Sequence, residues 1–300
     1  MQRREFIGVT AAALAGAMAA KADGAAVLLQ RVIPSSGEKI PVIGLGTSGP
    51  FEVGVDPQQR VPLGAVLEAF FAGGGTFIDT SPMYSTAEAV LGDLLTPAMQ
   101  ERAFVATKVW TRGEQEGVRQ MTRSRELLRR RKIDLMQVHN LLDLEVQLRT
   151  LRRWKAEGRI RYIGITHYTV ASHDTLAEII RREPLDFVQF NYSATTTAAE
   201  KTLLPLCADR GVATIINRAF DDGKIFAQLR GTALPSWAGD IGCSSWAQVL
   251  LKYVISHPAV TCVIPATGKV ANMQDNLAAG RGPLPDAPLR RAIAAAVQQV

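Results

Sequence analysis

The segment TFIDTSPMYSTAEAVLGDLLTPAMQERAFVATKV, residues 76–109, decides the fold because it joins two short apolar runs through a stretch of helical spacing. The runs at 76–81 and 103–109 are rich in β-branched and aromatic residues, whereas EAVLGDLL at 88–95 gathers its apolar residues on one helical face. A strand, a helix and a second strand in this order form a unit whose two strands lie parallel in one sheet.

The same alternation continues along the chain. Eight β-prone runs are present, at 42–48, 76–81, 103–109, 134–140, 161–167, 186–193, 213–220 and 261–267. Helical spacing follows each of them, at 64–74, 88–95, 124–131, 145–158, 174–183, 200–211, 244–258 and 270–280, with a C-terminal helix predicted from residue 289. Eight strand–helix units predict an α/β protein with a (β/α)8 TIM barrel, and an open doubly wound sheet is the alternative.

Two segments depart from the alternation. In residues 28–48, LLQRVIPSSGEKIPVIGLGTS, two β-prone runs flank the turn-forming residues 35–37, which predicts an N-terminal β-hairpin. Residues 221–243 form the longest break and follow the seventh predicted strand. Loops of this length commonly act as lids or pocket walls, so we expect this one to contribute to substrate choice.

The first 25 residues resemble a bacterial twin-arginine export signal. Arg3-Arg4 precedes Glu5-Phe6-Ile7 and a mildly apolar Ala/Gly-rich stretch, and Ala20-Lys21-Ala22 offers a small-residue cleavage site. The apolar stretch is too short and too rich in small residues for a transmembrane helix, so no stable membrane insertion is expected. An ordinary N-terminal helix is the alternative.

This interpretation divides the chain into a signal peptide over residues 1–25 and a single barrel domain over residues 26–300. The twin-arginine machinery would be a partner and would export the folded protein to the periplasm. If the signal is not used, the protein would stay in the cytoplasm.

The composition narrows the functional classes. The chain has 300 residues, is 47% hydrophobic and has a formal net charge of +6. Its arginine clusters lie in helix-like segments beside acidic residues, and no aromatic interleaving or zinc spacing accompanies them, so no nucleic-acid partner is expected. Three widely spaced cysteines and four unpaired histidines predict neither a disulfide framework nor a metal site.

Residues 44–49, GLGTSG, fit the G-x-G-x-x-G pattern of dinucleotide-binding Rossmann folds. Such a site needs a helix N-terminus directly after the glycines to hold the pyrophosphate. Here Pro50 and FEVGVDPQQ follow, and helical spacing starts only near Leu63. We therefore interpret the glycines as a barrel strand that ends in a loop.

Polar side chains end most of the predicted strands. In a (β/α)8 barrel the active site lies at the C-terminal ends of the strands. Because an isolated buried Lys or Asp is costly, Asp79, Lys108 and His139 on neighbouring strands are expected to pair across one mouth. The other polar residues at strand ends are Asn140, Thr166, His167, Gln189, Asn191, Asn217, Arg218 and the stretch 265–269.

Asp79, Tyr84, Lys108 and His139 are predicted to be catalytic. A tyrosine is a poor acid at neutral pH, and a neighbouring Lys108 ammonium would lower the pKa of Tyr84. Asp79 would hold Lys108 charged and in place, and His139 would donate a hydrogen bond to a substrate carbonyl. Tyr84 would then give its proton to the carbonyl oxygen as a hydride reaches the carbon.

From about residue 30 to 282 the chain also resembles the aldo-keto reductases. The matching motifs occur in the family's order and are 43–48, 77–84 with Glu88 and Leu91-Gly92, 106–110, Asp134-Leu135 with Val138-His139, 158–164, 189–191, and 263–265 with Asp275-Asn276. The resemblance implies a (β/α)8 barrel that binds NAD(P)H in extended form and reduces an aldehyde or ketone. It also implies catalytic roles for the four residues named above.

The resemblance further implies which residues hold the cofactor and the substrate. Substrate would pack against Met83, Trp110 and Asn140. The cofactor residues would be Thr47, Asp79, Thr166, His167, Gln189, Asn217, Arg218, Thr267, Lys269, Asp275 and Asn276. NADP(H) is the expected cofactor, with NAD(H) as the alternative.

Several of these cofactor positions depart from the family pattern. His167 stands where the family usually has Asn, and Asn217 where many members place a tyrosine that stacks on the nicotinamide. Ala266 and Asn272 replace basic residues that hold the 2′-phosphate in some members, so Lys269 would supply that charge, and Arg218 would reach the pyrophosphate.

Two other functions stay open from the sequence. One is a nicotinamide-binding redox sensor or accessory protein with little turnover. The other is a sugar-processing hydrolase, which needs paired carboxylates at strand ends, where only Asp79 is clearly placed. An export signal also implies that cofactor is loaded before export, because free NADPH is not expected outside the cytoplasm.

Overall fold

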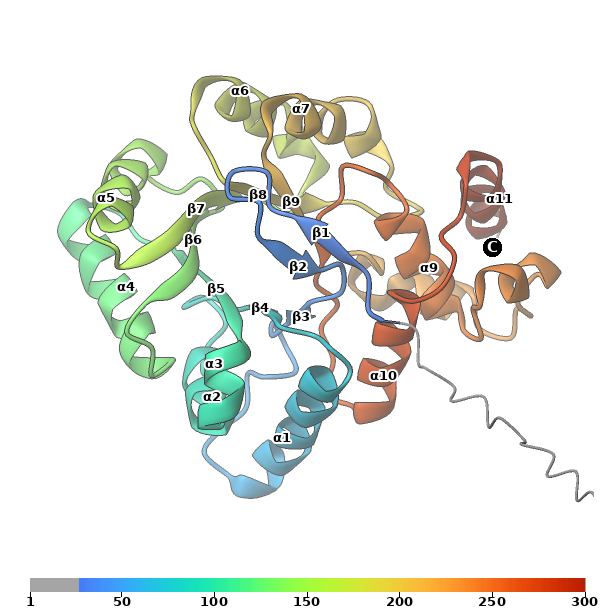
Figure 1. Ribbon diagram of the computed structural model, residues 1–300, viewed down its shortest axis with the longest axis horizontal. Helices are drawn as coiled ribbons and strands as arrows, with labels where there is room; N and C mark the ends of the chain where they lie inside the picture. Colours follow the sequence, from blue (N-terminus) through green and yellow to red (C-terminus); the bar gives the residue numbers. More distant parts are fainter. Residues whose placement is uncertain (1–26, 300) are drawn as a thin grey trace, which may run out of the picture.

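Eight parallel strands form the centre of the computed structural model, which describes residues 27–299 (Figure 1). The predicted export signal lies outside the described residues. The sheet order is β10-β9-β8-β7-β6-β5-β4-β3. Its strands are β3 (Leu45–Gly46), β4 (Phe77–Asp79), β5 (Phe104–Val109), β6 (Ile133–His139), β7 (Ile160–Thr166), β8 (Phe187–Asn191), β9 (Ala213–Asn217) and β10 (Cys262–Val263).

The two edges of this sheet meet, which gives a barrel. Parallel bridges join Ile43 to Val263 and Gly46 to Ala266, and so connect the β3 edge with the β10 edge. A Cβ at Gly46 would lie 2.6 Å from the carbonyl oxygen of Ile264, so this close approach of backbones requires glycine. The (β/α)8 prediction is confirmed, and the glycines of the G-x-G motif serve barrel closure.

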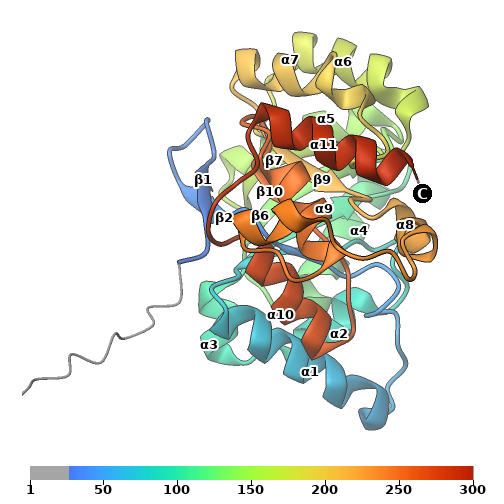
Figure 2. The same ribbon diagram turned by 90° about the vertical axis from the view of Figure 1, so that its right-hand side faces the viewer.

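Helices surround the barrel (Figures 1 and 2). They are α1 (Pro57–Ala72), α2 (Ala87–Leu94), α3 (Pro97–Arg102), α4 (Glu114–Leu127), α5 (Leu144–Ala156), α6 (His173–Arg182), α7 (Leu203–Arg210), α8 (Lys224–Gln228), α9 (Trp246–Ile255), α10 (Val270–Ala279) and α11 (Ala287–Gln298). Residues 221–243, predicted as one loop, contain the short helices η3 (Asp221–Gly223), α8 and η4 (Ser236–Ile241).

Three helix predictions need correction. Helix α1 begins at Pro57, before Leu63, because Asp56 caps it by accepting from the Gln58 amide at 2.9 Å. Helix α3 was not predicted. Helix α4 spans 114–127 where 124–131 was predicted, because its buried face is narrow (Gly117, Met121 and Ser124) and lacks apolar spacing. It ends before Arg129, whose φ is +54°.

The predicted N-terminal hairpin is present and closes one end of the barrel. Strands β1 (Gln30–Val32) and β2 (Lys39–Pro41) pair antiparallel around a turn in which Gly37 has a φ of +78°. Ile33 and Ile40 join an apolar cluster formed by the first residues of the barrel strands, among them Phe77, Phe104 and Phe187. Figure 2 shows the hairpin and α8 at opposite ends of the barrel.

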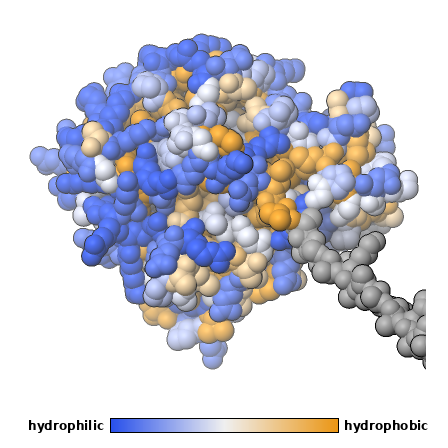
Figure 3. Space-filling model, in the orientation of Figure 1, coloured by the Kyte–Doolittle hydropathy of each residue, from blue (hydrophilic) through white to orange (hydrophobic). Residues whose placement is uncertain are grey.

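The hairpin end of the molecule presents a mostly hydrophilic face (Figure 3). Apolar side chains gather where the described chain begins, and Val27, Leu29 and Val32 are exposed there. The C-terminal ends of the barrel strands lie at the other end, away from this face.

Gly92→Ala is expected to destabilise the fold by about 1–3 kcal/mol, because a methyl group there would overlap the Leu127 carbonyl where α2 packs against α4. Gly64→Ala in α1 is the matched control. The nearest atom to its added methyl would be Leu94 Cδ2 at 3.9 Å, so better helix propensity should stabilise by about 0.5–1 kcal/mol. Chemical denaturation measures both, and equal effects would contradict this account.

Candidate active site

A cavity of about 690 Å³ opens at the C-terminal ends of the barrel strands. Its walls come from the strand ends, the loop after β4, and the segment that contains η3 and α8. The residues that line it are Gly46, Thr47, Ser48, Pro50, Asp79, Met83, Tyr84, His139, Asn140, Thr166, Tyr168, Gln189, Asn217, Arg218, Ala219, Phe220, Asp222, Gly223, Phe226, Ile264, Pro265 and Ala266.

Asp79 and Lys108 form a buried ion pair next to this cavity. Lys108 Nζ lies 2.5 Å from Asp79 Oδ1 and donates to the Thr80 carbonyl at 2.7 Å. Asp79 Oδ2 accepts from the amides of Gln137 and Gln189 at 3.1 and 3.0 Å. Burial opposes the charged form of Lys108, but the Asp79 carboxylate and Tyr84 together outweigh it, so the pKa of Lys108 is raised and the side chain stays cationic.

Gln137 was not identified from the sequence. It is fully buried in the middle of β6 and fixes the second oxygen of Asp79. The signal was a polar residue inside the apolar run DLMQVHN, which a strand facing a polar barrel interior would explain.

Tyr84 follows β4 and lies beside Lys108, whose Nζ is 4.9 Å from the centre of its ring. Burial raises the pKa of Tyr84, and the charge of Lys108 lowers it only in part, so the net shift is upward. The expected net lowering is therefore wrong, because it left out the cost of burying a phenolate. Tyr84 is consequently a protonated phenol at neutral pH.

His139 ends β6 and faces Tyr84. The two rings are nearly perpendicular, with centres 5.9 Å apart, and His139 Nδ1 lies 3.0 Å from Ser81 Oγ. Burial and then the nearby Lys108 charge lower the pKa of His139 to about 3. The imidazole is neutral, so one ring nitrogen donates and the other accepts.

The lowered pKa of His139 predicts a pH dependence of stability. Its pKa rises from about 3 in the folded chain to an ordinary value near 6.5 on unfolding, so the unfolded state binds the extra proton. Stability should be insensitive to this group above pH 6.5 and should fall as the pH drops toward 3.

Between pH 7 and pH 5 the wild type should lose about 2 kcal/mol more than His139→Gln, which lacks this group. Urea denaturation of both proteins at the two pH values measures the difference. Equal losses would show that His139 is not held in the neutral form.

The predicted cofactor residues divide into two groups. Those at the strand ends line the cavity, namely Thr47, Asp79, Thr166, Gln189, Asn217 and Arg218. Thr166 Oγ1 donates to Gln189 Oε1 at 2.9 Å, whereas the buried Asn217 Oδ1 has no hydrogen-bond partner among the described residues.

The second group lies just before α10 and within it, beyond the residues that line the cavity. Lys269 is exposed at the N-cap of α10, and its amide donates to Thr267 Oγ1 at 3.1 Å. Asn276 is buried, and Asp275 accepts from Ser245 Oγ at 2.7 Å and from Gln248 Nε2 at 2.6 Å. Together Lys269 and the positive end of the helix suit an anion.

His167 does not line the cavity. Its Nδ1 accepts from the amides of Tyr168 and Thr169 at 3.0 and 3.3 Å, and its Nε2 lies 3.1 Å from Ser172 Oγ. The ring thus holds its own loop in place. Tyr168, which the sequence analysis missed, lines the cavity instead and lies under the guanidinium of Arg218, 4.3 Å from its ring centre.

The predicted substrate residues surround the mouth. Met83 and Asn140 line the cavity, and the Trp110 ring lies 6.4 Å from that of His139. Segment 221–243 adds Phe226, whose ring centre is 4.9 Å from that of Phe220. Asp222 is the second carboxylate that lines the cavity, besides Asp79. A glycoside hydrolase would need both carboxylates free, but Asp222 Oδ1 pairs with Arg218 Nε at 3.3 Å.

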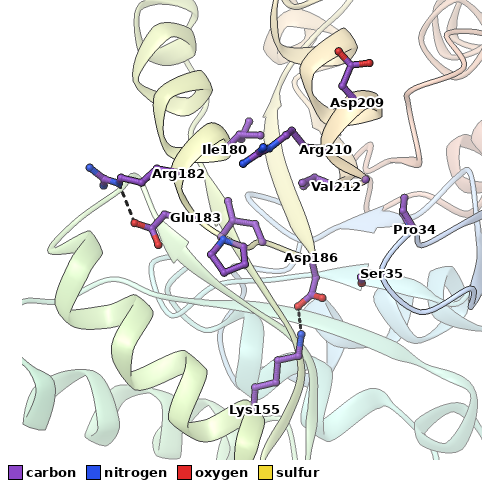
Figure 4. A pocket seen from close by; sticks show the side chains of 13 residues that line it. Pro34, Ser35, Lys155, Ile180, Arg182, Glu183, Asp186, Asp209, Arg210 and Val212 are labelled. Atoms are coloured by element: carbon purple, nitrogen blue, oxygen red, sulfur yellow. Dashed lines mark hydrogen bonds and ion pairs between the residues drawn. The ribbon is translucent and has the colours of Figure 1, made fainter.

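A second hollow, of about 730 Å³, lies at the hairpin end, between the loops that precede β8 and β9 (Figure 4). Charged side chains line it, and several of them pair with one another. Lys155 Nζ is 2.5 Å from Asp186 Oδ2, and Arg182 pairs with Glu183. It contains none of the predicted site residues.

Across residues 27–299 no helix combines the length and the apolarity needed to cross a membrane. In the same part of the chain, no group of three or more His, Cys, Asp or Glu side chains is arranged to hold a metal ion.

Solved structures share this fold. An aldo-keto reductase from Klebsiella pneumoniae in complex with NADPH is 23% identical with a TM-score of 0.76, and the match covers 90% of this chain and 95% of that one. An aldo/keto reductase from the same organism in complex with NADP and acetate is also 23% identical, with a TM-score of 0.74 and coverage of 87% and 93%.

Sequence comparisons give the family. The probable aldo-keto reductase 1 of Glycine max is 25% identical over an alignment of 293 residues, and the match covers 82% of this chain and 82% of that one. The family model described as the aldo/keto reductase family matches residues 42–294. The resemblance that the motifs indicated is thereby confirmed, and the chain belongs to the aldo/keto reductase family of oxidoreductases.

Proposed function

We propose that this protein reduces the carbonyl group of an aldehyde or ketone to an alcohol, with NADPH as hydride donor and Tyr84 as general acid. The buried Lys108–Asp79 pair beside Tyr84, at a cavity that His139 also lines, is the observation that carries the proposal. The NADP and NADPH complexes of the two similar Klebsiella structures support the choice of donor.

The side chains at the strand ends fit a nicotinamide. Thr166, Gln189 and Asn217 offer hydroxyl and amide groups, and the unpartnered Asn217 Oδ1 can accept from a carboxamide NH₂. Arg218 and Lys269 supply positive charge for phosphates, and Thr47, Thr267, Asp275 and Asn276 complete the proposed cofactor residues. When bound, the nicotinamide supplies a hydride to the carbonyl carbon.

The proton chemistry belongs to this chain's own residues. The raised pKa of Tyr84 keeps it protonated, as an acid must be before transfer. As Tyr84 gives its proton to the carbonyl oxygen, Lys108 stabilises the phenolate that remains, and Asp79 keeps Lys108 in position. The neutral His139 donates to the same oxygen, while Met83, Trp110 and Asn140 contact the rest of the substrate.

Two measurements on the purified full-length protein test this function. NADPH fluorescence should be quenched or shifted on binding, and NADPH should be oxidised in the presence of an activated aldehyde such as 4-nitrobenzaldehyde. Absence of NADPH binding would remove the proposed donor. Binding without oxidation of NADPH across a panel of aldehydes and ketones would favour the redox-sensor alternative.

We also propose that the protein is exported by the twin-arginine route, on the evidence of residues 1–25 alone. Replacement of Arg3 and Arg4 by lysine should retain the protein in the cytoplasm, since the pair is the recognised feature. Cell fractionation with N-terminal mass analysis measures this, and a wild-type cytoplasmic protein that still starts at Met1 would refute it.

A further inference from the structure

We propose that Ser81 fixes the tautomer of His139, so that the imidazole carries its hydrogen on Nε2. Ser81 Oγ lies 3.0 Å from His139 Nδ1 and accepts from the Met83 amide at 3.1 Å. Ser81 is fully buried and His139 is 5% exposed, so water does not readily replace either bond. Ser81 does not line the cavity, and its role is therefore positioning.

The hydrogen count at Ser81 selects the tautomer. A serine hydroxyl has one hydrogen to donate, and its oxygen already accepts from Met83. Among residues 27–299 the other side-chain or backbone partner of Ser81 Oγ is His139 Nδ1, so the hydroxyl hydrogen is satisfied when it points to that nitrogen.

The opposite tautomer leaves a group unsatisfied. If Nδ1 carried the hydrogen, two donors would point at Ser81 Oγ, and the serine hydrogen would have no acceptor in a buried position. Nδ1 is therefore the acceptor, and the hydrogen of the neutral ring lies on Nε2. In a neutral histidine, the hydrogen bond made by one ring nitrogen decides whether the other nitrogen donates or accepts.

This tautomer allows His139 to act as a hydrogen-bond donor in the proposed reaction. Only the Nε2–H form leaves a ring donor free of protein partners for a carbonyl oxygen in the cavity that His139 lines. This step rests on the proposed function, but the location of the hydrogen does not, and it can be measured without cofactor or substrate.

The direct test is a ¹⁵N–¹H correlation spectrum of the full chain labelled on its four histidines. His139→Gln identifies the His139 signals. The proposal requires a proton on Nε2 and an unprotonated, hydrogen-bonded Nδ1. A proton on Nδ1 overturns it, whether or not the protein reduces carbonyls.

Ser81→Ala tests the role of the hydroxyl. The Nδ1 resonance should shift to that of a nitrogen without a hydrogen bond. With NADPH and 4-nitrobenzaldehyde, kcat/KM should fall about 10- to 100-fold, the loss typical when the second hydrogen-bond partner of a metal-binding histidine is removed, while NADPH affinity stays unchanged. Ser81→Thr retains a hydroxyl and should recover the Nδ1 shift and most of the rate.

Ser124→Ala is the matched control, because Ser124 is also a buried serine that donates to one side chain, Glu88 Oε2 at 3.0 Å. It should leave the His139 resonances unchanged. Wild-type resonances in Ser81→Ala, or the same His139 shifts in Ser124→Ala, would overturn the assignment.

Discussion

Lys108→Met is expected to abolish carbonyl reduction and to destabilise the fold by about 3 kcal/mol. Lys108 is fully buried, and its removal leaves the Asp79 carboxylate in the interior without a counter-charge. The amides of Gln137 and Gln189 still donate to Asp79. The loss of stability should therefore lie at the lower end of the range for a buried ion pair that has lost one partner. Urea denaturation and NADPH oxidation measure the two effects.

The double variant Asp79→Asn/Lys108→Met separates charge from function. It removes both buried charges, so it should regain most of the stability that Lys108→Met loses, yet it should remain inactive. Lys201→Met, at an exposed position, should change stability by less than about 0.5 kcal/mol. Full stability of Lys108→Met would show that Asp79 does not need its partner, and retained reduction would exclude Lys108 from the chemistry.

Tyr84→Phe is expected to lower kcat by about 10²- to 10⁴-fold, because the ring keeps its packing while the proton donor is lost. NADPH affinity should stay within a factor of about two, since no proposed cofactor contact involves the hydroxyl. Stopped-flow single turnover with saturating NADPH measures the chemical step directly.

Tyr162→Phe provides the control for this change. Its hydroxyl donates to Glu38 Oε2 at 2.6 Å and lies 2.8 Å from Ser36 Oγ at the hairpin end of the barrel, so the substitution should cost stability while leaving kcat unchanged. Retained turnover in Tyr84→Phe would assign the acid to another group. An equal loss of turnover in Tyr162→Phe would show that the assay reports general damage.

The barrel was predictable because its pattern is local and repeated. Each unit supplies a short apolar run and a helical stretch, and eight such units leave few other arrangements. One of the corrected helices, α4, shows the limit of this argument. It buries Gly117, Met121 and Ser124 against its neighbours, and the apolar spacing on which the prediction depended is absent.

Residues that act through a partner were harder to predict. Ser81 carries no sequence signal of its own, and the polar Gln137 inside an apolar run does not reveal its partner, because their significance lies in contacts to His139 and Asp79 across the barrel. His167 was expected at the cofactor from the resemblance to the aldo-keto reductases, but its ring bonds to its own loop. Side-chain direction after a strand depends on loop conformation, which the motif does not specify.

The sequence by itself determined the barrel, the family and the residues that meet at the C-terminal strand ends. Strand order and the two-residue repeat of a strand fix which side chains point into the same end of the barrel. Only the tertiary structure decided the protonation of those residues. Lys108 alone would have lowered the pKa of Tyr84, but burial raises it, and burial likewise makes His139 neutral. Desolvation depends on every atom packed around a group, and a linear motif does not contain that information.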